Sequence, residues 1–374
     1  MSKAENKGST LLEPGQRVMK PAIDDKLATK LIWDLYGMEA TGIKEFNGYD
    51  DKNIFFKANI VHENKHIDAP SPHGYLLKVT NSEDSKDVEF FDAQHCMILH
   101  LAEAGIVVPE PVKNREGKLR YLVDYGISND KALHIVRVMK FIPGKILFDV
   151  DSWTTQHFYQ AGEFVGNMAV ALKDFSHPAY ETRNNIWFLS NIPSVKRFSY
   201  AVKDDRNRAL VEDIFEDFER EVIPVQDLLE VGYIHGDFNE QNIIVDSRGD
   251  IHGVIDFGDS QKNPLVYDIA IAIMYMMTKC GQINPCEVGG HVIAGYQTKR
   301  KIPPTELKLM RTLVAARYAQ SLTLGAYSYM QEPDEYVLIT AKTGWKTLAE
   351  FWHMPPDELN KIWIAALLKH IKVK

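Results

Sequence analysis

The sequence predicts an α+β fold of two lobes, a small lobe built mainly from antiparallel strands and a larger lobe built mainly from helices. Stretches of strand character fall between residues 42 and 141, with one helical segment among them. Pro143-Gly144 then interrupts the chain, and helical periodicity dominates the remaining residues. At 374 residues the chain is also too long for one ordinary domain, so two lobes are expected.

The elements of each lobe can be placed along the chain. Residues 1–21 are expected to form a flexible arm, and an amphipathic helix is expected over residues 24–36. The small lobe, residues 22–141, then has a helix over 85–104 and strands over 42–46, 54–61, 75–80, 120–123 and 134–141. The large lobe, residues 142–374, is mostly helical but has short apolar strands at 243–245 and 253–255.

Composition and charge narrow the class of partner. The hydrophobic fraction of 45% and the charged fraction of 25% are typical of soluble globular proteins. A net charge of −8 disfavours binding to nucleic acid or to an anionic membrane, and it suits a cationic small molecule. The three cysteines lack CxxC spacing and the chain lacks an apolar run of about 18 residues, so a cytoplasmic protein is expected.

The decisive motif is His235-Gly-Asp-Phe-Asn-Glu-Gln-Asn242, followed by Asp256-Phe-Gly-Asp259. Phosphoryl transfer needs a carboxylate that orients the attacking hydroxyl and hard oxygen ligands that hold Mg²⁺. Asp237 fits the role of the base, and Asn242 and Asp256 fit the role of metal ligands. A hairpin between residues 242–246 and 253–256 would bring these side chains into register. His235 has no second histidine at ligand spacing, so it is expected to be structural.

This set resembles the aminoglycoside phosphotransferase and choline kinase superfamily, whose members are relatives of the protein kinases. The resemblance implies a protein-kinase-like fold and transfer of a phosphoryl group from a nucleoside triphosphate to a hydroxyl. It also implies that Asp268 braces the catalytic loop. Gly236 stands where protein kinases have an arginine, and Pro264 follows Asp256 too closely to leave room for an activation loop, so a protein substrate is not expected.

The same resemblance suggests the nucleotide site of the small lobe. Lys78 matches the strand lysine that contacts the α- and β-phosphates, and Met139 and Phe141 lie in the segment that matches the purine-binding hinge. Asp92 is the expected partner of Lys78, with Glu89 and Gln94 as alternatives. The turn over residues 47–53 lacks a glycine-rich motif, so it fits a phosphate cradle and a plain hairpin loop equally well.

Further stretches resemble the hydroxylysine kinase family over residues 22–363, namely 183–187, 274–277, 289–292, Arg317 and 341–345. This resemblance implies GTP, or ATP, as phosphoryl donor and 5-hydroxy-L-lysine as acceptor. Such an acceptor carries a carboxylate and two amines. Arg317 is a candidate ligand for the carboxylate and Asp259 for an ammonium group, although either could equally form a structural ion pair.

Two other interpretations stay open. The chain could be a kinase of another small metabolite in the same superfamily, such as choline, homoserine, methylthioribose or an aminoglycoside. It could also be a catalytically inactive nucleotide-binding scaffold. The complete set of Lys78, Asp237, Asn242 and Asp256 favours an enzyme. The choice between GTP and ATP and the oligomeric state are not specified by the residues.

Overall fold

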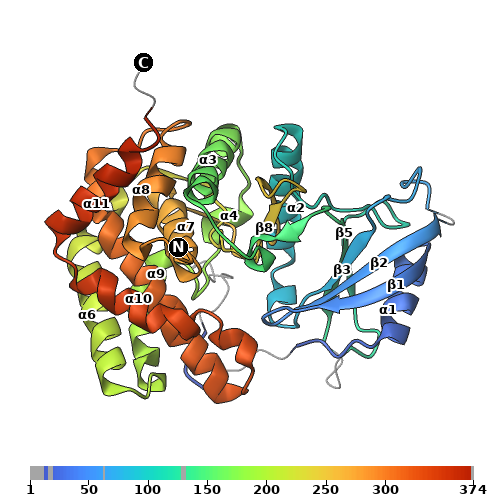
Figure 1. Cartoon of the computed structure of the whole chain (residues 1–374). Coiled ribbons are helices and arrows are strands. Elements are labelled where there is room, and N and C mark those ends of the chain that lie inside the picture. Colours follow the sequence, from blue (N-terminus) through green and yellow to red (C-terminus); the bar gives the residue numbers. More distant parts are fainter. Residues whose placement is uncertain (1–11, 16–19, 62–63, 128–131, 372–374) are drawn as a thin grey trace, which may run out of the picture. The chain divides into compact units, whose positions relative to one another are not determined.

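The computed structural model describes residues 12–15, 20–61, 64–127 and 132–371, and it divides into two compact units (Figure 1). The small unit comprises Gln16–Pro143 with His177–Ala179, and the large unit comprises Met1–Gly15, Gly144–Ser176 and Tyr180–Lys374. The expected arm over residues 1–21 lies mostly outside the described residues. Residues 12–15 of the arm contact the large unit, because Arg197 forms an ion pair with Glu13 at 2.7 Å.

The small unit contains a five-stranded antiparallel sheet in the order β1-β2-β3-β5-β4. The strands are β1 (Met38–Phe46), β2 (Lys52–Val61), β3 (Tyr75–Val79), β4 (Tyr121–Val123) and β5 (His134–Lys140). The helical elements are α1 (Asp25–Leu31), η1 (Ile32–Tyr36), η2 (Asp84–Lys86) and α2 (Val88–Glu103). The predicted small β-rich lobe with one helix between its strands is confirmed.

The two faces of this sheet differ in chemistry because successive strand residues point to opposite sides. On one face Ile54, Phe56 and Leu77 are buried in a core that includes residues of α1 and η1. On the other face Lys78 pairs with Arg137 of β5 and with Asn53 of β2. Lys78 of β3 therefore lies on the face of the sheet opposite to the apolar core.

The large unit is mainly helical and also holds two small sheets, β6-β8-β9 and β7-β10. Its strands are β6 (Lys145–Ile146), β7 (Val231–Ile234), β8 (Ile243–Val245), β9 (Ile251–Val254) and β10 (Gln261–Pro264). Its helices are α3 (Thr155–Ala171), α4 (Ala179–Thr182), α5 (Ile192–Val195), α6 (Asp205–Glu221), α7 (Leu265–Thr278), α8 (Pro285–Tyr296), α9 (Pro304–Gln331), α10 (Ala341–His353) and α11 (Pro356–Leu368). Shorter turns are η3 (Leu147–Asp149), η4 (Leu172–Asp174), η5 (Leu189–Asn191), η6 (Lys196–Ala201), η7 (Ile223–Leu228) and η8 (Glu335–Leu338).

Helix α7 forms the centre of this unit. Every residue from Leu265 to Met277 is buried, which is the pattern of a helix enclosed by protein on all sides. It contacts α3, α8, α9 and α10. Asp268 is its one charged residue, and it lies in the first turn, directly after the β7-β10 sheet. Among the described residues no helix is long and apolar enough to cross a membrane.

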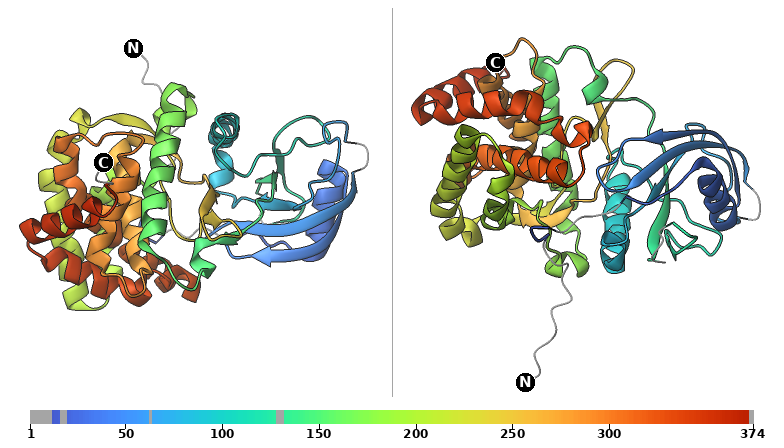
Figure 2. Two further views of the ribbon diagram at one scale, coloured as in Figure 1. Left: turned by 45° about the horizontal axis from the view of Figure 1, so that its top comes forward. Right: turned by 90° about the horizontal axis from the view of Figure 1, so that it is seen from below.

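Glycines allow three helices of the large unit to approach closely. Helix α3 lies along α8, and α8 lies along α11 (Figure 2). A Cβ on Gly162 would stand 1.9 Å from the Val292 carbonyl oxygen. Gly290 faces the backbone of α11 in the same way, with an added Cβ 2.4 Å from the Trp363 carbonyl oxygen, whereas a Cβ on Gly289 would stand 2.6 Å from the Trp363 indole. Backbone atoms cannot move aside as a side chain can, so residues 162 and 290 require glycine, and at residue 289 a larger side chain would have to displace the indole.

We predict that Gly162→Ala lowers the free energy of unfolding by about 2–3 kcal/mol, because α3 and α8 must separate to admit the methyl group. Urea denaturation followed by tryptophan fluorescence measures this change. The control is Gly344→Ala in α10, whose added Cβ would meet side chains only, the nearest being Leu322 at 3.2 Å. That variant should stay within about 1 kcal/mol of the wild type. Equal losses in both variants would contradict the close contact between helices.

Candidate active site

Asp268 fixes the loop that follows β7. Its carboxylate accepts hydrogen bonds from the backbone amides of His235 at 3.1 Å and Gly236 at 2.9 Å. Burial raises the pKa of Asp268, while His235 and the two amide hydrogen bonds oppose this rise. A buried acid that binds two adjacent amides holds the backbone in one conformation. This is the bracing contact that the superfamily resemblance implies.

The imidazole of His235 joins the same loop to the segment that ends at Asp256. Its Nδ1 accepts a hydrogen bond from the Asp237 amide at 3.2 Å, so Nε2 carries the proton and donates it to the Ile255 carbonyl at 3.1 Å. The ring also packs against Phe257, with 4.8 Å between ring centroids. His235 therefore has the structural role that was predicted for it.

Gly236 allows the loop to approach the residues that follow Asp256. Its φ of +80° lies in the left-handed region, and a Cβ would stand 2.3 Å from the Asp259 carbonyl oxygen and 2.6 Å from Gln261 Nε2. Asp256 itself has a φ of +62°, which is unusual for a residue other than glycine. Such strain is found where a side chain must be held in a particular position, and Asp256 is a predicted metal ligand.

The Asp237 carboxylate is held at three points. Arg317 Nη2 donates to Oδ1 at 2.9 Å, and this contact is an ion pair. Asn239 Nδ2 and Asn242 Nδ2 both donate to Oδ2, at 2.7 and 3.0 Å. The carboxylate is partly exposed, with 20% of the side chain accessible. Asp237 is therefore fixed in orientation and still open to a ligand.

Asn242 and Asp256 lie at the same end of the β8-β9 hairpin, as predicted. The Ile255 amide donates to the Asn242 carbonyl at 2.8 Å, which places Asn242 opposite the residue before Asp256. Because Asn242 Nδ2 also donates to the Asp237 carbonyl at 3.0 Å, the side-chain oxygen of Asn242 is the atom left for a ligand. An amide oxygen and an exposed carboxylate are ligands that Mg²⁺ accepts, so these residues fit the metal.

Asp259 adds a third carboxyl group to this region. It is partly buried, and burial together with the negative charge of Asp237 raises its pKa to about 7, while Arg317 and Arg183 act in the opposite direction. Arg183 also donates to the Gly258 carbonyl at 2.6 Å. Three acids near one another favour a cation, either a metal ion or an ammonium group.

Arg317 lies in surroundings that differ from those expected of a substrate ligand. Its side chain is 1% exposed. Both nitrogens of the guanidinium fork bind protein groups, with Nη1 donating to the Trp187 carbonyl and to Gln320 Oε1, each at 2.9 Å. Nη2 donates to Asp237 and also to the Tyr275 hydroxyl, at 3.2 Å. Both Nη1 and Nη2 of Arg317 therefore donate to protein groups, and neither is left to bind a substrate carboxylate as expected.

In the small unit, Lys78 lies close to an acid that the sequence did not indicate. Its positive charge lowers the pKa of Asp51, although burial has the larger effect and raises that pKa to about 6. Asp51 is held by the Asn81 amide, which donates to Oδ1 at 2.9 Å. Nothing in the spacing pointed to Asp51, because it precedes β2 and reaches Lys78 only through the pairing of β2 with β3.

The expected partner of Lys78, Asp92, is engaged elsewhere. Its carboxylate forms a bidentate ion pair with Arg120, at 2.8 and 2.6 Å, on the exposed side of α2. Gln94 is buried and accepts a hydrogen bond from Arg137, while Glu89 is exposed. Helical periodicity predicted the existence of α2, but it did not predict the rotation that decides which side chain faces the sheet.

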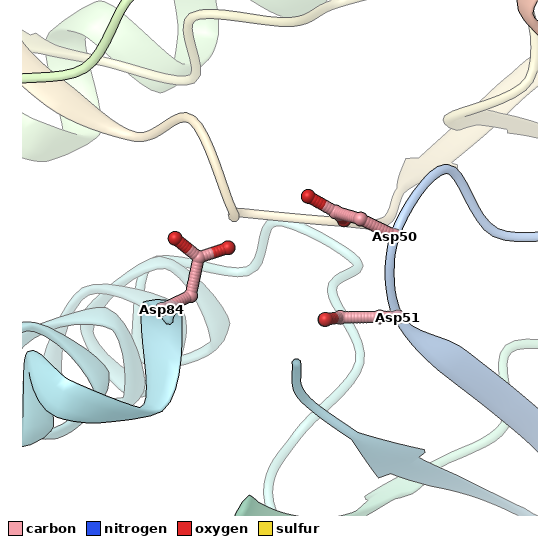
Figure 3. A group of neighbouring side chains, drawn as sticks. All are labelled: Asp50, Asp51 and Asp84. Atoms are coloured by element: carbon pink, nitrogen blue, oxygen red, sulfur yellow. The ribbon is translucent and has the colours of Figure 1, made fainter. Parts of the chain in front are cut away.

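The turn between β1 and β2 carries an acidic group, Asp50 and Asp51, which is completed by Asp84 of η2 (Figure 3). Oxygen atoms of the three carboxylates lie within 4.8 Å of one another. Asn81 Nδ2 donates to both Asp51 and Asp84, at 3.3 and 2.8 Å. This spacing is compatible with a cation. The negative charge would repel a phosphate that arrived without a cation.

At the end of β5, around Phe141, aromatic rings lie close together and the backbone amide of Phe141 is already hydrogen-bonded within the protein. The rings of Phe141 and Phe55 lie 4.8 Å apart, and those of Phe141 and Phe46 lie 6.2 Å apart. Met139 is buried and pairs with Leu76. The Phe141 amide donates to the Gly74 carbonyl at 3.1 Å, so it is not available to a purine. The side chains near Phe141, in contrast, present partly exposed rings.

Comparisons with known proteins agree with this chemistry. Residues 58–300 match the model of the phosphotransferase enzyme family. Hydroxylysine kinase of Xenopus laevis is 33% identical over 380 residues, which cover 96% of this chain and 97% of that protein. Hydroxylysine kinase of Mus musculus is 31% identical, with 93% of this chain and 94% of that protein covered.

A solved structure gives the same fold. An amicoumacin kinase, determined in complex with AMP-PNP and Ca²⁺, superposes with a TM-score of 0.68 over 91% of this chain and 98% of its own. The identity is 15%, so this similarity establishes the shared kinase-like fold and nothing of the acceptor.

We predict that Gly236→Ala reduces turnover by about 100-fold, because the loop must move away from Asp259 and thereby displaces Asp237. The control is Gly249→Ala in the β8-β9 turn. Gly249 also has a left-handed φ, +87°, but its Cβ would meet nothing within 4 Å. The control should lose about 1 kcal/mol of stability and keep its activity. If both variants kept full turnover, the loop position would not matter for catalysis.

Proposed function

Since the chain belongs to the phosphotransferase enzyme family, as a small-molecule phosphotransferase of the hydroxylysine kinase type, we propose that it transfers the γ-phosphoryl group of GTP or ATP to the hydroxyl of 5-hydroxy-L-lysine. Similarity to two hydroxylysine kinases over more than nine-tenths of the chain supports this acceptor. One observation carries the reaction type, namely the three-point hold on Asp237 beside Asn242.

Asp237 is the proposed base. The acceptor oxygen forms a bond to the γ-phosphorus, the bond from that phosphorus to the β–γ bridging oxygen breaks, and the hydroxyl proton passes to Asp237. The nucleoside diphosphate leaves with the electron pair. Because the transition state of such transfers is loose, catalysis depends mainly on positioning and on charge stabilisation. The hydrogen bonds from Asn239 and Arg317 supply the positioning.

Asn242 and Asp256 are the proposed Mg²⁺ ligands. When bound, Mg²⁺ neutralises negative charge that develops on the phosphates during transfer. The free side-chain oxygen of Asn242 and the exposed carboxylate of Asp256 supply hard donors, and their shared position at the end of the β8-β9 hairpin supports this assignment.

Lys78 is proposed to contact the α- and β-phosphates, and the segment containing Met139 and Phe141 is proposed to contact the purine. These two assignments are supported by the position of Lys78, Met139 and Phe141 on the same face of the sheet. Phe55 pairs with Leu76, two residues before Lys78, and its ring contacts Phe141. A partly exposed aromatic surface beside a cation suits a purine nucleotide. Asp92 has no part in this proposal because it binds Arg120.

The proposed acceptor fits the charge of the region around Asp237. An ammonium group of the acceptor would be attracted to Asp259, whose neighbours include Asp237 and Asp256. A carboxylate ligand is not assigned, since the fork of Arg317 is occupied within the protein. The negative net charge of −8 adds a general attraction for cationic acceptors.

The test of this function is nucleoside diphosphate release with Mg²⁺, with GTP and ATP supplied separately and with 5-hydroxy-L-lysine, lysine, choline or homoserine as acceptor. We expect turnover with 5-hydroxy-L-lysine and none with lysine, which lacks the hydroxyl. Asp237→Asn should bind nucleotide normally and lose about 10²–10⁴-fold in turnover. Turnover with a different acceptor would show that the proposed substrate is wrong, while the proposed mechanism would still hold. Nucleotide binding without turnover on any acceptor would indicate a scaffold.

We also predict that the KM for 5-hydroxy-L-lysine falls about tenfold between pH 6 and pH 8. The pKa of Asp259 is raised to about 7, so the carboxylate is mostly protonated below that pH and mostly ionised above it. Only the ionised form attracts an ammonium group strongly. Steady-state kinetics across this range measure the effect, and Asp259→Asn serves as the control because it should have a high KM at every pH. A KM that changes equally in both proteins would show that Asp259 does not bind the amine.

A further inference from the structure

Arg317 is a cation enclosed in the middle of α9. With 1% of its side chain exposed, it needs protein partners for both its charge and its hydrogens. Asp237 is the acid at ion-pair distance, 2.9 Å from Nη2. Loss of the Asp237 charge would leave the buried Arg317 cation without its acidic partner, so Arg317 depends on Asp237.

The guanidinium is also held rigidly from other elements. Nη1 donates to Gln320 and to the Trp187 carbonyl, and Nη2 donates to the Tyr275 hydroxyl of α7. Gln320 is fixed in turn, since its Nε2 donates to the Ile186 carbonyl at 2.9 Å and to the Phe188 carbonyl at 3.1 Å. The planar guanidinium is therefore fixed by contacts with α7, α9 and residues 186–188, and it fixes the orientation of the Asp237 carboxylate in turn.

The contacts of the Asp237 carboxylate differ between its two oxygens. An ionised carboxylate offers about four acceptor sites, roughly two on each oxygen. Oδ2 receives hydrogens from Asn239 and Asn242, whereas Oδ1 receives one from Arg317. The acceptor site that is left over is therefore on Oδ1, the oxygen that Arg317 holds.

We infer that Arg317 is a positioning residue for phosphoryl transfer, which holds Asp237 so that Oδ1 receives the proton of the acceptor hydroxyl. This inference rests on the proposed role of Asp237 as base. The O–H bond of the acceptor breaks as its oxygen bonds to the γ-phosphorus, and the proton moves to Oδ1. Arg317 makes no contact with the acceptor and acts through Asp237.

The experiment compares Arg317→Met and Arg317→Lys with Arg311→Met. Arg311 lies on the same helix, where it packs over Trp352 at 4.0 Å and binds the Trp352 carbonyl, away from Asp237. We expect kcat to fall about 100-fold in Arg317→Met, with the KM for 5-hydroxy-L-lysine nearly unchanged. Arg317→Lys keeps the charge and should lose less, and Arg311→Met should keep its kcat. If Arg317→Met does not fold, the folded Arg317→Lys variant gives the same comparison of kcat with KM.

A second acceptor separates positioning from carboxylate binding. The decarboxylated form of 5-hydroxylysine keeps the hydroxyl and both amines. If Arg317 positions Asp237, the variants lose the same factor in kcat with either acceptor. A rise in KM that is confined to 5-hydroxy-L-lysine would overturn the inference and make Arg317 a carboxylate ligand.

A double-mutant cycle tests whether Arg317 acts through Asp237. In the Asp237→Asn background, Arg317→Met should change kcat by less than about threefold, because the group that it positions is already lost. A further loss of about 100-fold in that background would overturn the inference. If Asp237→Asn alone kept wild-type turnover, the proposed base itself would be wrong. If Asp237→Asn lost turnover but neither Arg317 variant did, only the inference would fail.

Discussion

Residues 235–237 are held by two buried charges, a carboxylate that binds the backbone and a guanidinium that binds the Asp237 side chain, and the proposed chemistry of the large unit depends on this arrangement. Asp268 binds the amides that precede Asp237, and Arg317 binds the carboxylate of Asp237 itself. Both charges project from helices that are buried over most of their length, so neither can shift without disturbing the core. A loop without regular hydrogen bonds thereby gains the rigidity that catalytic positioning requires.

The two units differ in the sign of the charges that gather near their candidate site residues. In the large unit, three acids share one region and are partly neutralised by Arg317 and Arg183. In the small unit, Lys78 and Arg137 stand side by side on one sheet face, and Asp51 supplies the opposite charge. In the proposed function, the cations of the small unit suit the phosphates of a nucleotide, and the acids of the large unit suit a metal ion or an ammonium group.

Much of the fold and part of the site could be predicted because they depend on local sequence. The strands of the small unit, helix α2 and the hairpin that aligns Asn242 with Asp256 are predicted by periodicity and short spacing, whereas the short strands β6, β7 and β10 were not predicted. Contacts across long separations could not be predicted. Arg317 lies 80 residues from the carboxylate that it holds, and the error over Asp92 arose from the rotation of α2, which no short-range pattern specifies. The acceptor was suggested only by resemblance, since no spacing encodes it.

The contact of Gly289 and Gly290 with Trp363 gives a structural reason for one stretch, residues 289–292, that resembles the hydroxylysine kinases. These glycines are required because a larger residue would collide with the indole and the backbone of α11. They record how the helices of the large unit are assembled, and they lie in α8, whereas the acids that favour a cation follow β7 and β9. A change of acceptor would therefore place no demand on this glycine pair, whereas a change at Trp363 would alter the space that the pair must leave. The glycine pair therefore reflects helix packing, and residues that select the acceptor must be sought in the surroundings of Asp237 and Asp259.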